Sequence, residues 1–145
     1  MALYETQLSL TLEAALELAQ HAQRCAGEMG FTMNTVVVDR AGMVLVTLRN
    51  PNAPDASLAF AERKAYTAAS YGWATLKWDA MVLERPLVMQ GLSQNPKLCL
   101  IAGGVPIQID GQTIGALGVA GAKAPEDHAV AQAALEAFFA AHQSN

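Results

Sequence analysis

The sequence predicts an α+β fold in which a five-stranded antiparallel sheet carries helices at both chain ends and central helices packed on it. Short turns, not helices, make most of the connections between the strand-like segments, which favours antiparallel neighbours over parallel strands. Helical patterns occupy both ends and the middle of the chain. With 145 residues, no repeat and no linker, the chain is expected to form one domain over residues 1–145.

The first helix is expected from about Thr11 to Met29. Thr11 is a suitable N-cap residue, and Gly30 suits the position after the last turn. Only one stripe of this helix is clearly polar. Because a helix that is apolar over most of its circumference is packed on two sides, we expect it to contact the sheet and a second element or subunit.

A β-hairpin and a helix are expected next. The segments 35–39 and 43–48 are rich in β-branched residues and flank a turn at Arg40-Ala41-Gly42. Asp55 or Ser57 can cap a helix that runs to about residue 69. Residues 72–97 are predicted to form short helices, interrupted by prolines, that lie over one face of the fold.

The last part of the chain is expected to form three strands and a helix. The strands are predicted at Leu98–Ile101, Val105–Ile109 and Thr113–Val119, and Asp110-Gly111 is a strong hairpin signal between the last two. Pro125 and the two acids after it are typical of a helix start, so a final helix is expected to about residue 142.

The composition favours self-association. Hydrophobic residues make up 52% of the chain and charged residues only 15%, against a usual charged share of about 25%. We therefore expect another copy to cover part of the apolar surface. The alternative is a monomer rich in glycine and alanine with an ordinary surface.

Several classes of protein are disfavoured. The net charge is −4 and no basic cluster is present, which argues against nucleic-acid binding. No stretch is long and apolar enough to span a membrane, and the N-terminus lacks a secretory pattern. Cys25 and Cys99 match no zinc or redox spacing, so we expect reduced thiols, no bound metal ion and a cytoplasmic protein.

Four segments, in this order, resemble those of the GlcG/HbpS-like family, which also occurs as the C-terminal domain of PduO-type proteins. They are Val36–Gly42 with Arg49, Ala61–Ala68, Ala102–Ile107, and Ile114–Gly121 followed by Asp127. Ala120 departs from the pattern, because many relatives carry serine there. The resemblance implies the five-stranded sheet and assembly into dimers and rings. It further implies haem binding or degradation, or an accessory role in glycolate, diol or aromatic catabolism.

The resemblance directs attention to residues that could hold haem. His21 is the first candidate for the iron, because imidazole is a common axial ligand, although a histidine at a helix contact is the alternative. Lys64 and Thr67 lie three residues apart and share one helix face, which suits a carboxylate-bearing planar ligand. The alternative is a surface lysine and a threonine bonded to its own helix.

Other residues could hold an anion. Arg49 has the planar group of a carboxylate clamp, and Asp39 could pair with it, or act as a base. Gly103-Gly104 could form a backbone nest for an anion, or allow close packing. No catalytic residue is assigned, because the sequence has no nucleophile elbow and no phosphate-loop pattern.

Three hypotheses follow. The first is a cytoplasmic, homo-oligomeric haem-binding protein that uses His21, Thr67, Lys64 and Arg49. The second is an accessory enzyme or sensor for a small hydroxy-, keto- or aromatic acid, with Lys64, Asp39 and Gly103-Gly104 forming its pocket and Lys64 or Asp39 moving a proton. The third is an interaction subunit without a ligand.

Overall fold

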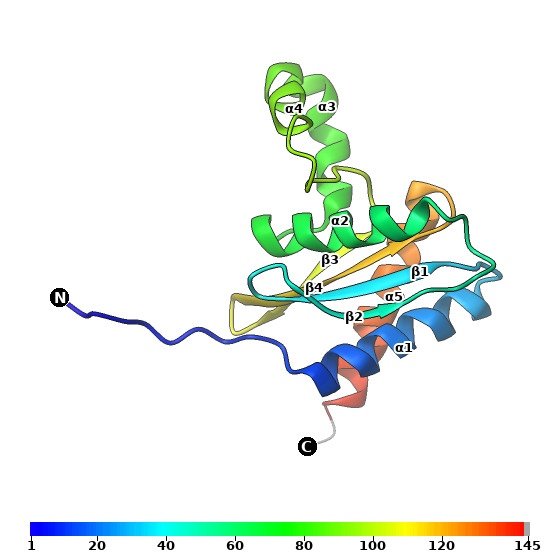
Figure 1. The fold of residues 1–145 in the computed structure, drawn as a ribbon, viewed down its shortest axis with the longest axis horizontal. Coiled ribbons are helices and arrows are strands. Elements are labelled where there is room, and N and C mark those ends of the chain that lie inside the picture. Colours follow the sequence, from blue (N-terminus) through cyan, green and yellow to red (C-terminus); the bar gives the residue numbers. More distant parts are fainter. Residues whose placement is uncertain (144–145) are drawn as a thin grey trace.

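The computed structural model describes residues 1–143 and shows an α+β fold in which helices cover both faces of one sheet (Figure 1). The four antiparallel strands lie in the order β2-β1-β4-β3; their bounds are β1 (Asn34–Asp39), β2 (Val44–Leu48), β3 (Gly104–Ile109) and β4 (Gln112–Ala120). One face carries α1 (Leu12–Glu28) and α5 (Ala124–Ala141), and the other carries α2 (Ser57–Tyr71).

The expected fifth strand at Leu98–Ile101 is wrong. Hydrogen bonds from side chains of α2 and from a turn hold this segment, and it does not pair with the edge of the sheet. The Cys99 backbone N–H donates to Thr67 Oγ1 at 2.9 Å, and the Leu98 N–H donates to the Asn95 carbonyl at 3.1 Å. The Arg63 guanidinium donates to the Leu98 carbonyl at 2.7 Å. The backbone groups that a strand would need are therefore already bonded elsewhere.

The local signals at the first helix and hairpin are confirmed. Thr11 Oγ1 accepts a hydrogen bond from the Ala14 N–H at 3.2 Å, as an N-cap side chain does. Asp39 Oδ1 accepts from the N–H groups of Ala41 and Met43 at 2.9 and 3.0 Å, which fixes the turn between β1 and β2. The helix α1 contacts both the sheet and α5, so its second packing partner lies within the same chain.

The helix α2 lies unusually close to the sheet because two strand residues facing it are glycines. A Cβ atom on Gly118 would lie 1.9 Å from the Ala61 carbonyl oxygen, and one on Gly104 would lie 2.3 Å from the Lys64 carbonyl oxygen. Small residues fill the rest of this interface, namely Ala65, Ala68, Ala116 and Ala120 with Val36 and Val38. This close approach brings the middle of α2 against the backbone of β4.

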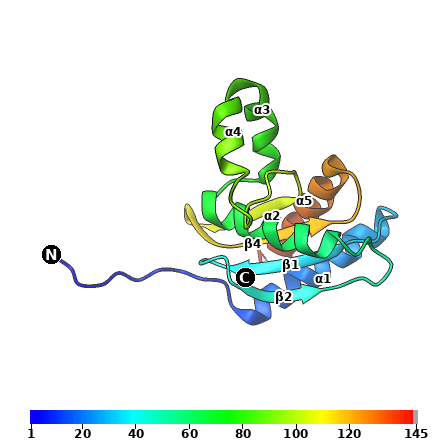
Figure 2. The ribbon, with the colours of Figure 1, turned by 45° about the horizontal axis from the view of Figure 1, so that its top comes forward.

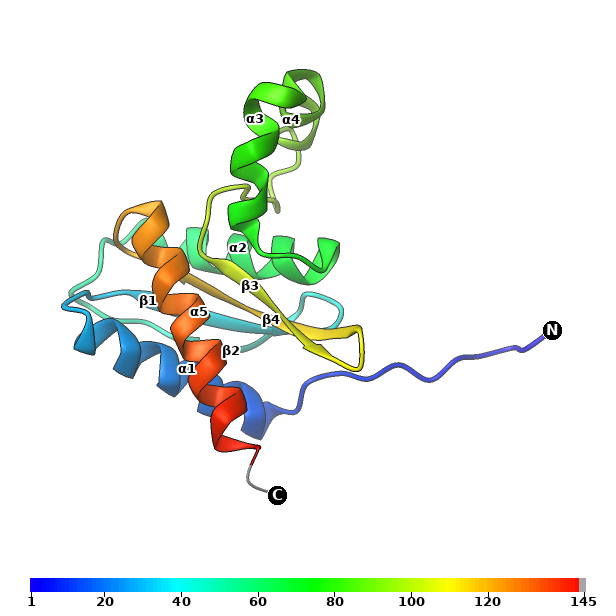
Figure 3. The same cartoon turned by 180° about the vertical axis from the view of Figure 1, so that it is seen from behind.

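Residues 72–97 form short helices as expected, but they project from the body instead of lying over it (Figures 2 and 3). We call residues 75–92 the arm; it contains η1 (Thr75–Ala80), α3 (Met81–Glu84) and α4 (Pro86–Leu92). No residue of α3 or α4 is buried. Within residues 1–143, no helix is long and apolar enough to cross a membrane.

Candidate functional site

The strongest candidate site surrounds Lys64, a lysine in the middle of α2 that is only 2% exposed. Its Nζ donates to Asp127 Oδ2 at 2.8 Å and to the Val119 carbonyl at 3.2 Å. An ammonium carries three N–H groups, so two are used by the protein and one is left for a ligand. A buried amine with a spare donor is suited to binding an anion.

Asp127 is the partner of this amine and is 3% exposed in the first turns of α5. Its Oδ1 accepts from the Ala122 N–H at 2.9 Å, which joins the carboxylate to the turn before the helix. Burial raises the pKa of Asp127, and the hydrogen bond and positive charge of Lys64 counteract part of that rise. The pair therefore ties α2 to the start of α5.

A cavity of about 280 Å³ lies beside the pair. Phe60 and Ile101 form its outer part and are 39% and 48% exposed, whereas Lys64 and Asp127 form its polar base. Its remaining lining residues lie at the start of α2 and just before it, and from the end of β4 to the start of α5, namely Pro54, Ala56, Ser57, Ala120, Gly121, Ala122 and Ala124. Ala120 contributes a methyl group to this wall.

Gly103 and Gly104 border the amine but do not form an anion nest. Gly103 has φ +133°, and a Cβ there would lie 2.8 Å from Lys64 Nζ, so glycine leaves space for the amine. The Gly104 N–H donates to Thr75 Oγ1 at 2.9 Å and is not available to a ligand. These glycines therefore serve close packing around Lys64.

Thr67 does not share the cavity with Lys64. Its hydroxyl donates to the Arg63 carbonyl at 2.7 Å and accepts from the Cys99 N–H at 2.9 Å. The side chain is fully buried and both of these bonds are to backbone atoms. Thr67 therefore fastens the segment after the arm to α2.

The structure does not bring the other candidates to this cavity. His21 lies on α1, across the sheet from Lys64, with Nδ1 3.0 Å from an Arg24 guanidinium nitrogen. Arg49 is exposed just after β2 and does not line the cavity. Asp39 is the last residue of β1, whereas the cavity-lining Ala120 lies opposite the first residue of that strand. The Oδ1 atom of Asp39 already accepts two hydrogen bonds from the hairpin turn.

Sequence reasoning missed the role of Asp127, although the residue belongs to one of the family-like segments. Its signal was a carboxylate just after a glycine turn at the start of a helix. Nothing local connects it to Lys64, because the two lie 63 positions apart in the sequence. Ile101 was missed because its segment was expected to be a strand.

Comparison with known proteins gives a consistent result. The sequence model of the family described as "Haem degrading protein HbpS-like" matches residues 10–136. An uncharacterised 15.0 kDa protein from the dhaT-dhaS intergenic region of Citrobacter freundii is 31% identical over 131 residues, which cover 90% of this chain and 92% of that protein.

Three solved structures share the fold over most of their length. Klebsiella pneumoniae protein ORFY is 30% identical with a TM-score of 0.88, and 97% of each chain is covered. A double mutant of Streptomyces reticuli HbpS is 34% identical with a TM-score of 0.84, covering 92% of this chain and 90% of that one. PduOC, solved as a complex with haem, is 28% identical with a TM-score of 0.81, covering 90% and 95%.

Proposed function

Because the chain belongs to the family of HbpS-like haem-degrading proteins, we propose that it is a self-associating cytoplasmic protein that binds haem. The observation that carries this proposal is the spare N–H group of buried Lys64 at the base of a cavity with an apolar rim. The complex of PduOC with haem supports the choice of ligand.

The residues of the cavity fit one edge of a haem group. Lys64 would hold a propionate carboxylate, and Phe60 and Ile101 would contact the apolar macrocycle. At about 280 Å³ the cavity is slightly smaller than the usual ligand cavity of about 300–1,000 Å³. It therefore suits the carboxylate edge, with the macrocycle against the exposed rim.

The iron would need a ligand from outside this cavity, because its lining includes no histidine, cysteine, methionine or tyrosine. We propose His21, whose Nδ1 faces Arg24 and whose Nε2 is the other coordinating atom of the ring. Since His21 and Lys64 lie on opposite faces of the sheet, they can serve one haem only from two different copies. Arg49 is exposed and is the proposed partner of a second carboxylate.

Self-association and cytoplasmic location have their own support. The accessible surface is 8199 Å², whereas the size scaling of compact monomers gives about 7,100 Å² for this mass. Exposed apolar side chains lie on the extended N-terminal residues and on the arm, including Leu3, Tyr4, Leu83 and Leu87. Cys25 and Cys99 are free thiols, as is usual in reducing compartments.

Haemin titration followed in the Soret region tests the proposal. We expect saturable binding by the native chain and at least about tenfold weaker binding by Ile101→Glu, because a carboxylate at the rim repels a propionate. Ile109→Glu is the matched control, since Ile109 is similarly exposed (41%) but lies outside the cavity. His21→Ala is expected to change the position of the Soret band. A native titration no larger than that of an inert carrier protein would refute haem binding.

A second candidate function is supported by the cavity volume, which suits a small carboxylic acid better than a whole macrocycle. In this function Lys64 binds the acid beside Gly103 and is the proposed proton carrier; an accessory enzyme or a sensor could both use such a site. Asp39 is less suited, because its Oδ1 already holds the hairpin turn.

Thermal-shift screening against hydroxy-, keto- and aromatic acids distinguishes this candidate from haem binding. We expect a stabilising acid to act on the native chain and on Ile109→Glu, and to lose its effect on Ile101→Glu. If no acid stabilises the native chain while haemin binds, the acid function is excluded. If neither binds, the ligand-free interaction subunit is favoured.

A further inference from the structure

The arm is a part of the fold whose apolar side chains its own chain leaves uncovered. Leu83 and Leu87 are 91% and 80% exposed, and Val82 and Val88 about half exposed. The helices α3 and α4 pack mainly on each other and on η1, not on the sheet (Figure 1). Large apolar side chains gathered on a projecting element usually mark an interaction surface.

The base of the arm is held firmly, so the arm has a defined direction. Trp78 is 3% exposed and packs edge-on against Tyr71 and Trp73, with ring centroids 5.0 and 5.2 Å apart. Thr75 Oγ1 accepts the Gly104 N–H at 2.9 Å, which joins the base to β3. A surface that is already ordered loses less conformational entropy when it binds.

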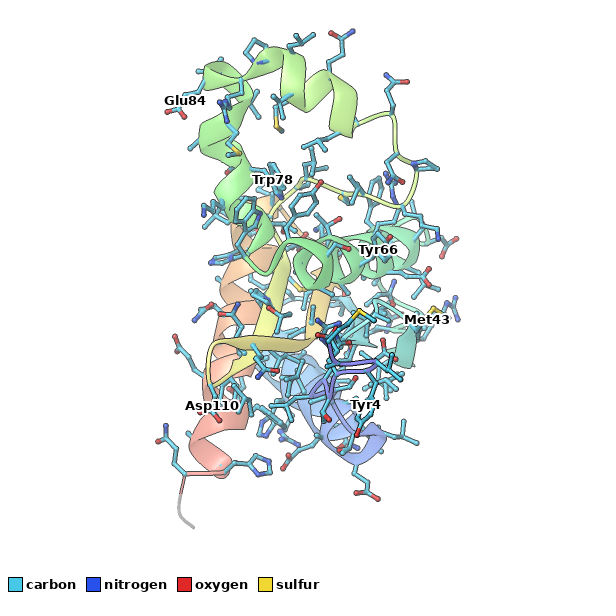
Figure 4. All side chains as sticks on the ribbon, turned by 90° about the vertical axis from the view of Figure 1, so that its left-hand side faces the viewer. Tyr4, Met43, Tyr66, Trp78, Glu84 and Asp110 are labelled. Carbon is cyan, nitrogen blue, oxygen red and sulfur yellow. The ribbon has the colours of Figure 1, made fainter. Side chains whose placement is uncertain are left out.

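A groove of about 540 Å³ lies on the outer side of α2, beside the place where the chain returns from the arm. Met43 and Val44 of the hairpin supply apolar walls and are 67% and 42% exposed. The other lining residues are Gly42, Glu62, Arg63, Tyr66, Pro96 and Lys97. Figure 4 shows the labelled Met43 and Tyr66 on one flank of the molecule and Glu84 at the far end of the arm.

We propose that the arm of one copy lies in this groove of a second copy, and that the second copy's arm lies in the groove of the first. Leu83 and Leu87 would meet Met43 and Val44, which removes apolar surface from water on both sides. This inference rests on the self-association part of the proposed function and assigns the surfaces that perform it.

Charge complementarity supports this pairing. The arm carries Glu84 and Arg85 at the junction of α3 and α4, and the groove carries charges of both signs at Glu62, Arg63 and Lys97. Among residues 1–143, none of these five makes an ion pair within its own copy. Opposite charges at the rim of an apolar contact help to fix its register.

A second copy fits this surface better than an unrelated protein, because each copy carries both an arm and a groove. A two-fold axis between two copies can then satisfy both contacts at once and close the assembly.

Sedimentation velocity of the native chain and variants tests the proposal. We expect the native chain to sediment as a dimer or a larger assembly. The arm variant Leu83→Glu, Leu87→Glu and the groove variant Val44→Glu are expected to raise the dissociation constant at least about a hundredfold, since central apolar contacts dominate such interfaces. Leu12→Glu is the control, because Leu12 is 60% exposed on α1. All three variants change exposed residues only, and circular dichroism checks that each variant is folded.

The results separate the arm proposal from the broader function. If the native chain assembles and the arm variant assembles equally well, the arm proposal is overturned while self-association stands. If the native chain is monomeric at every concentration, both fall, and haemin titration then decides ligand binding alone.

Cross-linking adds a direct readout of which surfaces meet. In a background with Cys25→Ala and Cys99→Ala, a chain with Leu87→Cys is mixed with a chain with Met43→Cys and oxidised. A disulfide between the two chains is expected, and a mixture with Gln112→Cys in place of Met43→Cys is expected to give none. Equal cross-linking in both mixtures would contradict the proposed contact.

Discussion

Replacing Lys64 with methionine is expected to lower the free energy of unfolding by about 3–5 kcal/mol at neutral pH, the usual cost of leaving one charge of a buried pair alone. Asp127 would keep its bond to the Ala122 N–H but lose Lys64, which among residues 1–143 is the one cation that forms a salt bridge with it. Urea unfolding followed by circular dichroism measures the change.

The matched control is the double variant Lys64→Met, Asp127→Asn. It leaves no charge in the cavity, and the asparagine oxygen can still accept from the Ala122 N–H. We therefore expect it to recover more than half of the lost stability. A single variant that loses less than about 1 kcal/mol would show that the amine is solvated and is not the base of a cavity.

The same variant is expected to depend on pH in a defined direction. Burial raises the pKa of Asp127 and Lys64 counteracts the rise, so removal of Lys64 raises that pKa further. An acid whose pKa is higher in the folded than in the unfolded state binds protons on folding, so stability falls as pH rises through the folded-state pKa. The deficit of Lys64→Met relative to the native chain should therefore be smaller at pH 5 than at pH 7.

The sequence predicted elements whose signals are local. The cap at Thr11 and the turn at Arg40-Ala41-Gly42 are decided by residues within a few positions, and the structure has both where expected. Leu98–Ile101 has strand-like composition, but bonds from Arg63 and Thr67 hold it to a helix more than 30 residues earlier. The direction of the arm is likewise set by tertiary contacts of Trp78, which spacing does not reveal.

The candidate site was predicted in part for the same reason. Helical spacing places Lys64 and Thr67 on one side of α2. Only the structure shows that the Thr67 hydroxyl is hydrogen-bonded to backbone groups and that Lys64 lines a cavity. The pattern of a helix also does not tell which face of the sheet it covers, so His21 and Lys64 were grouped although the sheet separates them.

Replacing Gly118 with alanine is expected to cost at least about 3 kcal/mol, at the upper end for overpacking a core. The new Cβ would lie 1.9 Å from the Ala61 carbonyl oxygen and 2.7 Å from the Ala65 nitrogen. Both are backbone atoms of α2, so no side-chain rotation relieves the clash and the helix must move away from β4.

Gly27→Ala is the control, because a Cβ on Gly27 meets nothing within 4 Å and the residue lies in α1. It is expected to raise stability by about 0.5–1 kcal/mol, the usual gain for alanine over glycine in a helix. Movement of α2 in Gly118→Ala would also carry Lys64 away from Val119 and Asp127, so haemin or acid binding should weaken together with stability. If Gly118→Ala is as stable as the native chain and binds haemin or the acid equally well, then the close approach of α2 to β4 does not set the geometry of the cavity.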